Sequence, residues 1–163
     1  MADLAYTVPG LGTEDSQRLV ESLQDRLHAM NDLHLTLKHA HWNVVGPQFV
    51  AVHEMLDPQV ELVRGYADEL AERIAQLGAS PVGTPGRLVA DRGWSDYELG
   101  RAGTQEHLAA LNTVYDGVIS SNRKAITLAG ELDPVTEDIL IGQTAELEKF
   151  QWFVRAHLEG TQA

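Results

Sequence analysis

The chain has 163 residues, of which 44% are hydrophobic, and its 12 Lys+Arg against 24 Asp+Glu give a formal net charge of −12. It contains no cysteine, which excludes a disulfide framework, a thiolate zinc finger and a cysteine nucleophile, so a bound metal must use histidine nitrogen and carboxylate oxygen. The acidic balance argues against a nucleic-acid binder that neutralises phosphates, and no apolar run is long enough to span a membrane. We therefore expect a cytoplasmic protein with one domain, residues 1–163.

Leucines recur at three- or four-residue spacing in the first part of the chain. This periodicity predicts a helix from Thr13, its expected cap, to about Asn43, after an extended segment over residues 1–12. A second apolar stripe predicts a helix from about Phe49 to Leu77. The two stripes consist of Leu19, Leu23, Leu27, Met30, Leu33 and Leu37, and of Val52, Leu56, Val60, Val63, Ala67, Leu70 and Ile74.

The remainder of the chain predicts a crossover and two further helices. Four Gly and two Pro between Gly78 and Trp94 predict a long crossover, with a short helix near Pro85 to Ala90. A third helix is expected from about Asp96 or later to Ala129. The last helix should run from Pro134, which suits a first helical position, to Gly160, before a short tail at residues 161–163. Four long helices with one long crossover between the second and third predict an all-α, ferritin-type four-helix bundle.

Four ionisable residues of the second expected helix share one stripe. At about 100° per residue, His53, Asp57, Asp68 and Glu72 fall within about 100° of one another around the helix axis. The stripe borders the apolar face of the helix. Ionisable groups turned toward packed surface cost free energy unless they are paired or bind a metal, so this stripe is a candidate metal site.

The spacing of these residues divides them into two half-sites. At a rise of about 1.5 Å per residue, Asp57 and Asp68 lie roughly 16 Å apart along the helix and cannot share one ion. An antiparallel copy of the helix, supplied by a second subunit across a two-fold axis, would place Asp68 and Glu72 of one chain beside His53 and Asp57 of the other. His41 could add a second imidazole if the first helix packs alongside. Such a ligand set suits iron(II) or zinc.

Each residue also has a simpler interpretation. The pair Asp68 and Glu72 is typical of a solvated helix face, and Trp42 alone is typical of a buried aromatic residue. The segment from His53 to Asp57 lacks the second histidine of a zinc-protease helix. A divalent metal in this environment could alternatively activate water for hydrolysis, although the sequence shows no substrate pocket for a hydrolase.

Three segments carry a resemblance to a known family. They are Lys38-His39-Ala40-His41-Trp42-Asn43-Val44-Val45-Gly46-Pro47, then Phe49 with Val52-His53-Glu54-Met55 and Asp57, and then Asp68-Glu69-Leu70-Ala71-Glu72-Arg73. This pattern closely resembles the Dps family, the DNA-binding proteins from starved cells, which are mini-ferritins. The resemblance covers essentially the whole chain and looks closest to actinobacterial members.

The resemblance implies a homo-dodecameric cage, built from two-fold dimers, that oxidises iron(II) preferentially with hydrogen peroxide and stores the ferric product. Such a ferroxidase would protect the cell from oxidative damage. The motif positions of its centre fall on His41, His53 and Asp57 of one chain and on Asp68 and Glu72 of its mate. No membrane is implied.

Further roles follow from the same resemblance. Lys38 would lie close to the centre as a cation, and Trp42 would be a nearby aromatic residue able to quench a stray radical. Glu54 resembles a position that faces the cavity and helps mineral to nucleate. The candidates for acidic entry pores are Asp133, Glu137 and Asp138, although the helix dipole favours acids in a first turn without any pore.

The sequence departs from the family in one respect that bears on DNA. Members that coat DNA usually do so through lysine-rich tails, whereas residues 1–17 contain no Lys or Arg. A shell of twelve such chains would carry a formal charge near 12 × −12 = −144, which opposes a polyanion. The sequence therefore argues against DNA binding.

Overall fold

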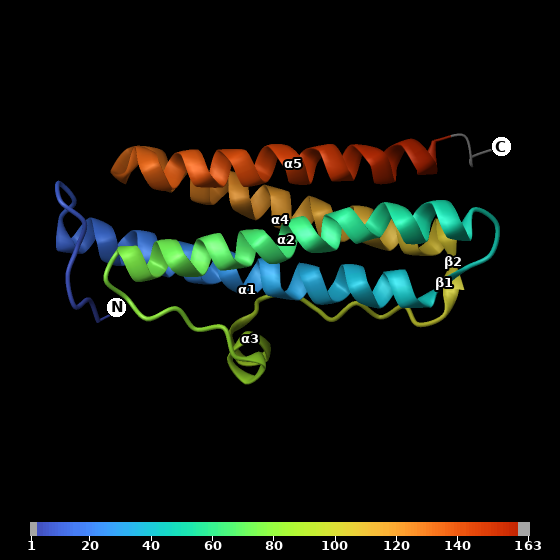
Figure 1. Ribbon diagram of the computed structural model, residues 1–163, viewed down its shortest axis with the longest axis horizontal. Coiled ribbons are helices and arrows are strands. Elements are labelled where there is room, and N and C mark those ends of the chain that lie inside the picture. Colours follow the sequence, from blue (N-terminus) through green and yellow to red (C-terminus); the bar gives the residue numbers. More distant parts are fainter. Residues whose placement is uncertain (1–2, 160–163) are drawn as a thin grey trace.

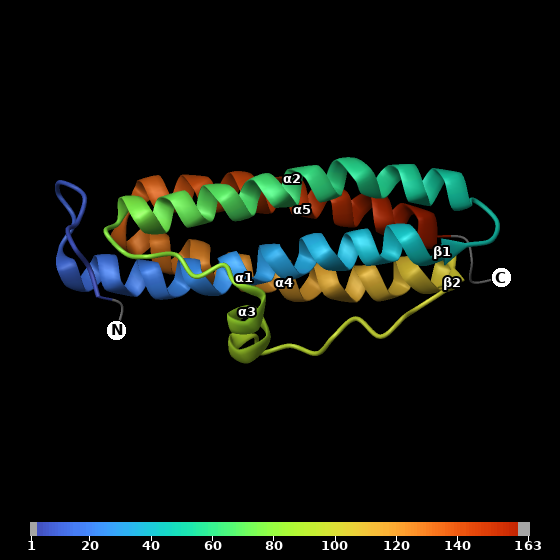
Figure 2. The ribbon, with the colours of Figure 1, turned by 60° about the horizontal axis from the view of Figure 1, so that its bottom comes forward.

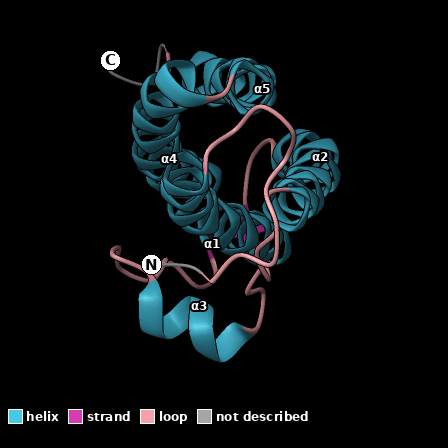
Figure 3. Cartoon of the chain, turned by 90° about the vertical axis from the view of Figure 1, so that its left-hand side faces the viewer, coloured by secondary structure: helices cyan, strands magenta, loops and turns pink. Residues whose placement is uncertain are grey.

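Four long helices and one short helix make up the fold. The computed structural model describes residues 3–159 and contains α1 (Thr13–Asn43), α2 (Phe49–Gln76), α3 (Pro85–Asp91), α4 (Thr104–Leu132) and α5 (Pro134–Leu158) (Figure 1). Viewed end-on, the four long helices form a bundle and α3 lies outside it, beside α1 (Figure 3). The all-α bundle with a short helix in its crossover is therefore confirmed. The tail expected at residues 161–163 and the helix end expected at Gly160 lie outside the described residues.

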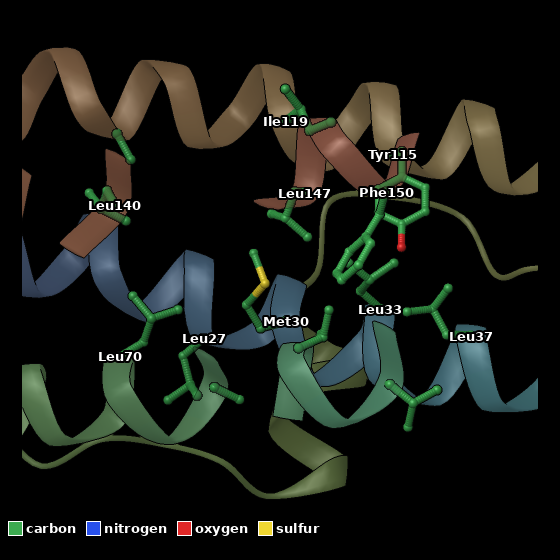
Figure 4. Packing of buried hydrophobic residues seen from close by; sticks show 14 of the residues in the cluster. Leu27, Met30, Leu33, Leu37, Leu70, Tyr115, Ile119, Leu140, Leu147 and Phe150 are labelled. Atoms are coloured by element: carbon green, nitrogen blue, oxygen red, sulfur yellow. The ribbon is translucent and has the colours of Figure 1, made fainter. Parts of the chain in front are cut away.

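The core runs along the whole bundle. Each long helix contributes fully or nearly fully buried side chains, and Figure 4 shows Met30 and Leu33 of α1 facing Tyr115 of α4 and Phe150 of α5. Burying one such side chain contributes about 1.5–3 kcal/mol, so the leucine periodicity explains why these segments fold as helices against one another. Within residues 3–159, no helix is long and apolar enough to cross a membrane.

The chain between α3 and α4 lies along the outside of the bundle (Figure 2). The Trp94 Nε1–H donates to Asp32 of α1 at 2.7 Å, and His39 Nε2 of α1 donates to the Leu99 carbonyl, also at 2.7 Å. These bonds hold the segment extended, and α4 accordingly begins at Thr104, well after the earliest expected residue.

A two-strand parallel sheet closes one end of the bundle. In it β1 (Val44–Val45) pairs with β2 (Ala102–Gly103). The loop that follows β1 uses positive φ at Gly46 (97°) and Gln48 (64°), which turns the chain sharply between α1 and α2. The end of α1 therefore lies beside the beginning of α2.

The helix starts differ in how they are capped. Thr13 was expected to cap α1, but the N-cap is Gly12, which has no side chain to bond the first turn. The start of α5 is capped as the sequence suggests, with Pro134 at the first helical position. The Asp133 carboxylate accepts hydrogen bonds from the backbone N–H groups of Val135 and Thr136.

Candidate metal centre

Two histidines from neighbouring helices stack at the end of the α1–α2 pair. The imidazoles of His41 and His53 lie 3.6 Å apart between ring centroids, with an interplanar angle of 23°. His41 Nδ1 is 3.0 Å from the His53 backbone carbonyl, and His53 Nδ1 is 2.9 Å from the His41 carbonyl. A carbonyl only accepts, so each Nδ1 carries the proton and each Nε2 keeps its lone pair for a metal.

Asp57 lies one helical turn after His53 and completes a three-residue cluster. Its Oδ1 is 3.3 Å from His41 Nδ1, and one ligand atom from each of His41, His53 and Asp57 lies within 4.8 Å of the others. His41 is buried, His53 is half-buried and the Asp57 side chain is about half exposed. Two imidazole nitrogens and a carboxylate oxygen are suitable ligands for iron(II), with positions left open for further ligands.

The Asp57 carboxylate also forms a hydrogen bond with Lys38 of α1. The Lys38 Nζ donates to Asp57 Oδ1 at 2.9 Å. This hydrogen bond is the main reason that the pKa of Asp57 lies below its ordinary value, with smaller contributions from the two histidines. Asp57 is therefore ionised at neutral pH and available to a cation.

Asp68 and Glu72 do not join this cluster. Both are exposed on α2, further along the same helix, and they belong to no cluster of possible metal ligands within residues 3–159. Asp68 lines a surface groove of about 600 Å³ between α1, α2 and the crossover, together with Leu27, Arg64 and Pro81. The single chain thus presents three ligands at one end of α2 and two carboxylates toward the other.

The remaining candidate residues from the sequence differ in how exposed they are. Trp42 follows His41 directly, and its 70% exposure overturns the simpler expectation of a buried aromatic residue. Glu54 and Asp138 are exposed and Glu137 is half-buried. Asp133 is buried, and Arg73 Nη2 donates to its Oδ2 at 2.6 Å, so its carboxylate is engaged inside the subunit.

Sequence reasoning missed two hydrogen-bonded pairs, one within the centre and one outside it. The reciprocal bonds between His41 and His53 arise from the tight loop at Gly46, and residue spacing gives no signal for them. A second hydrogen-bonded pair, Tyr97 and His107, lies where β2 joins the bundle. Neither of these two residues belongs to a recognisable motif.

The comparisons with known proteins agree with this geometry. A family model for the ferritin-like domain matches residues 20–163. The chain is 61% identical over 155 residues to the DNA protection during starvation protein of Mycolicibacterium smegmatis, which covers 95% of this chain and 85% of that protein. The bundle is therefore that of a ferritin-like protein.

Two solved structures narrow the relationship. The structure of DpsA14 from Streptomyces coelicolor matches with a TM-score of 0.95 at 62% identity, covering 98% of this chain and 96% of that one. Dps from Microbacterium arborescens in its high iron form matches with a TM-score of 0.85 at 30% identity, covering 94% and 99%. The chain belongs to the Dps group of the ferritin-like family. Membership of this family supports a role in iron storage and in protection from oxidative damage.

Proposed function

We propose that this protein oxidises iron(II) with hydrogen peroxide at a centre shared between two subunits and stores the ferric product in a cage. The observation that carries the proposal is the incomplete ligand cluster: His41, His53 and Asp57 converge with both Nε2 atoms free. Asp68 and Glu72 lie too far along α2 to reach the same ion from the same chain, at about 16 Å or more from Asp57.

A two-fold related subunit supplies the missing ligands. Because an isologous dimer repeats each contact, the antiparallel α2 of a second copy brings its own Asp68 and Glu72 to the cluster and receives the same in return. The groove beside Asp68 is open on the single chain, which leaves the carboxylate accessible to that copy. Dimers of this kind would build the dodecamer.

Each residue then has a role in handling the substrates, iron(II) and peroxide. The two imidazoles and Asp57 bind iron(II) in one half of the centre, while the second chain's carboxylates bind it in the other. Lys38 offsets the charge of Asp57 while iron is absent. Two iron(II) ions give one electron each to one peroxide, whose O–O bond breaks to leave two waters after protonation. Carboxylate ligation favours the iron(III) product.

The other acidic residues serve the path of iron in this proposal. Exposed Glu54 helps the mineral to nucleate, and Glu137 and Asp138 contribute to an entry pore at the start of α5. Asp133 stands at the same helix start, but its carboxylate is paired with Arg73 and adds little negative charge to that pore. Trp42, exposed beside His41, is the nearest indole to quench a radical that escapes.

The double variant Asp68→Ala with Glu72→Ala tests the shared centre. We expect the wild type to consume one peroxide per two iron(II), and the variant to lose the fast oxidation by about 100-fold, as removal of metal-binding groups typically does. Stopped-flow absorbance of the ferric product measures the rate, and solution mass confirms assembly. Glu14→Ala, which removes an exposed acid from the first turn of α1 that has no role in the proposal, is the matched control.

Two outcomes would contradict the proposal. Unchanged oxidation kinetics in the double variant would remove Asp68 and Glu72 from the centre. Zinc-dependent ester or amide hydrolysis that persists without iron would instead favour a metal-dependent hydrolase at the same residues.

A further inference from the structure

Tyr97 differs from the other hydrogen-bonded tyrosines in the partner of its hydroxyl. Its oxygen lies 2.8 Å from Nδ1 of His107, whereas Tyr6 donates to a backbone carbonyl and Tyr115 to a side-chain amide oxygen. Carbonyl and amide oxygens accept hydrogen bonds but do not take up a proton at neutral pH, while imidazole does. Tyr97 is thus a phenol in contact with a base.

The surroundings keep the phenol protonated and the base neutral. Tyr97 is half-buried and His107 is fully buried, with their rings close to parallel at 5.9 Å between centroids. Burial raises the pKa of Tyr97. Burial also lowers the pKa of His107, against which the backbone of Gly100 and Asn43 acts in the opposite direction. At neutral pH, His107 can therefore receive a proton from the phenol.

The direction of this hydrogen bond depends on the tautomer of His107. With the proton on Nε2, Tyr97 donates to Nδ1 at 2.8 Å. With the proton on Nδ1, the ring donates to the Tyr97 oxygen over the same contact, and the hydroxyl donates to the His107 backbone carbonyl at 3.4 Å. Transfer of the phenolic proton to Nδ1 requires the first tautomer, which we take as that of the resting pair.

The pair lies one helix away from the metal centre. The rings of His39 and Tyr97 are 6.0 Å apart, and His39 also holds the crossover through the Leu99 carbonyl. His39 precedes the candidate ligand His41 by two residues, which places the two imidazoles on opposite sides of α1. An α-helix with its side chains is about 10–12 Å across, so an electron has one helix to traverse between Tyr97 and the centre.

We propose that Tyr97 and His107 form a reversible one-electron donor that quenches oxidising radicals made when peroxide meets a single iron(II). The proposal rests on the function proposed above, which supplies both reactants. When peroxide takes one electron instead of two, its O–O bond breaks to give hydroxide and a hydroxyl radical, and the radical then needs an electron from another source. A phenol in contact with a base supplies it inside the fold.

Tyr97 gives one electron to the hydroxyl radical, which takes a proton from solvent and becomes water. The phenolic proton of Tyr97 moves to Nδ1 of His107, leaving a neutral tyrosyl radical and an imidazolium. A second iron(II) then returns one electron to the radical and becomes iron(III), while His107 returns the proton. The cycle consumes two iron(II) and one peroxide, the same stoichiometry as the paired reaction.

The base is what makes this site suitable. Oxidising a phenol without removing its proton leaves a cation in a largely apolar place, which costs several kcal/mol. Transfer of the proton over one existing hydrogen bond avoids that charge on the ring. Tyr115, although fully buried, lacks such a base, because its partner is the amide of Gln59.

Flash photolysis of the assembled, iron-free protein tests the proposal. A photo-oxidised ruthenium tris-bipyridyl complex withdraws one electron, and electron paramagnetic resonance detects the radical formed. We expect a tyrosyl signal in the wild type, its loss in Tyr97→Phe, and its retention in the matched control Tyr115→Phe. A tyrosyl signal that survives in Tyr97→Phe, or a wild-type signal of indole character alone, would overturn the assignment.

The variant His107→Gln separates a base from a mere hydrogen-bond acceptor. Gln can accept the hydrogen bond but not the proton, so Tyr97 oxidation should slow about 100-fold, the lower end of what a positioned base contributes. An unchanged rate would refute the role of His107. Should these variants fail to assemble, the wild type decides alone: its oxidation should slow in D₂O, and no slowing would count against proton transfer.

Because no iron is present, this test is independent of the ferroxidase proposal. Loss of the tyrosyl signal with normal iron oxidation would overturn the donor only. A normal signal with no effect of Asp68→Ala and Glu72→Ala on iron oxidation would overturn the shared centre only.

Discussion

Near the end of α2, the side chain of Arg73 has a structural role, although it directly follows a candidate metal ligand in the sequence. Arg73 follows the candidate ligand Glu72 but points into the protein, where its guanidinium bonds Thr136, Gln76 and Asp133. Asp133 therefore serves both as the N-cap of α5 and as the partner of a buried cation. Arg73 and Asp133 together tie the helix that carries Asp68 and Glu72 to the start of α5.

Replacing Asp133 by Asn tests this tie. Asn can still cap α5 but leaves the buried Arg73 without its counter-charge, so we expect a loss of about 3 kcal/mol at neutral pH. At roughly 2–4 °C per kcal/mol for a chain of this size, the unfolding midpoint should fall by about 6–12 °C. Circular dichroism at fixed protein concentration measures it, with exposed Asp138→Asn as the control.

The pH dependence of that loss has a definite sign. Burial raises the pKa of Asp133, but hydrogen bonds from Thr136 and Arg73 outweigh burial and hold the pKa below its ordinary value. The stabilisation from Asp133 is therefore complete above the unfolded pKa, about 3.9, and is lost as pH falls through the lower folded value. The wild type and the variant should converge in acid, and a difference that stayed constant down to pH 3 would contradict the ion pair.

At the scale of elements, the N-terminal segment and α2 stabilise each other. Backbone N–H of Ala5 donates to the Gly78 carbonyl at 2.9 Å, and the Tyr6 hydroxyl donates to the Ala75 carbonyl at 3.0 Å. Gly78 ends α2 with φ of +90°, and a Cβ there would meet the Tyr6 carbonyl oxygen at 2.0 Å. The segment can approach this closely only because residue 78 has no side chain.

Gly78→Ala should therefore detach the segment and strain the turn. A residue forced into positive φ costs about 1–3 kcal/mol, so the unfolding midpoint should drop by several degrees. Gly117→Ala is the matched control, since that helical glycine has nothing within 4 Å of an added Cβ, and it should stabilise by about 0.5–1 kcal/mol. Equal midpoints for both variants would show that the segment is not held as described.

The sequence was most informative about long helices, in which apolar residues repeat at regular spacing over many turns. Because burial of one helix face leaves a regular pattern, the spacing of apolar residues predicted α1 and α2 nearly to the residue. Pro134 marked the start of α5. The start of α4 was not marked in this way. Residues 92–101 are held by individual bonds to Asp32 and His39, and such long-range contacts leave no periodic signal.

Helical geometry also predicted part of the candidate site, because the structure brings together His41, His53 and Asp57, whereas the addition of Asp68 and Glu72 from a second chain stays a prediction. Helical spacing alone separates Asp57 from Asp68, and the structure brings His41 to His53 and Asp57. The tautomers set by reciprocal carbonyl bonds, and the exposure of Trp42, depend on how the α1–α2 loop folds. Asp57, Asp68 and Glu72 are exposed on the single chain, and in the proposed assembly another copy would cover them.

At the scale of the whole molecule, charge sets which partners can approach. The negative field of a chain with net charge −12 attracts iron(II) to its surface. The proposed shell of twelve subunits would multiply this field. The same field repels nucleic acid, whose binding depends on cations that displace the counterions of phosphate. Residues 1–17 carry no Lys or Arg that could serve as a basic arm.

We therefore expect no retention of DNA by the assembled protein in a gel-shift assay at moderate salt. A variant extended at its N-terminus by six lysines is the matched gain-of-function control. It should retain DNA, and its affinity should fall steeply as salt rises, because each phosphate contact releases about one counterion. A clear shift by the unmodified chain without added divalent cation would show that local positive charge outweighs the net negative field.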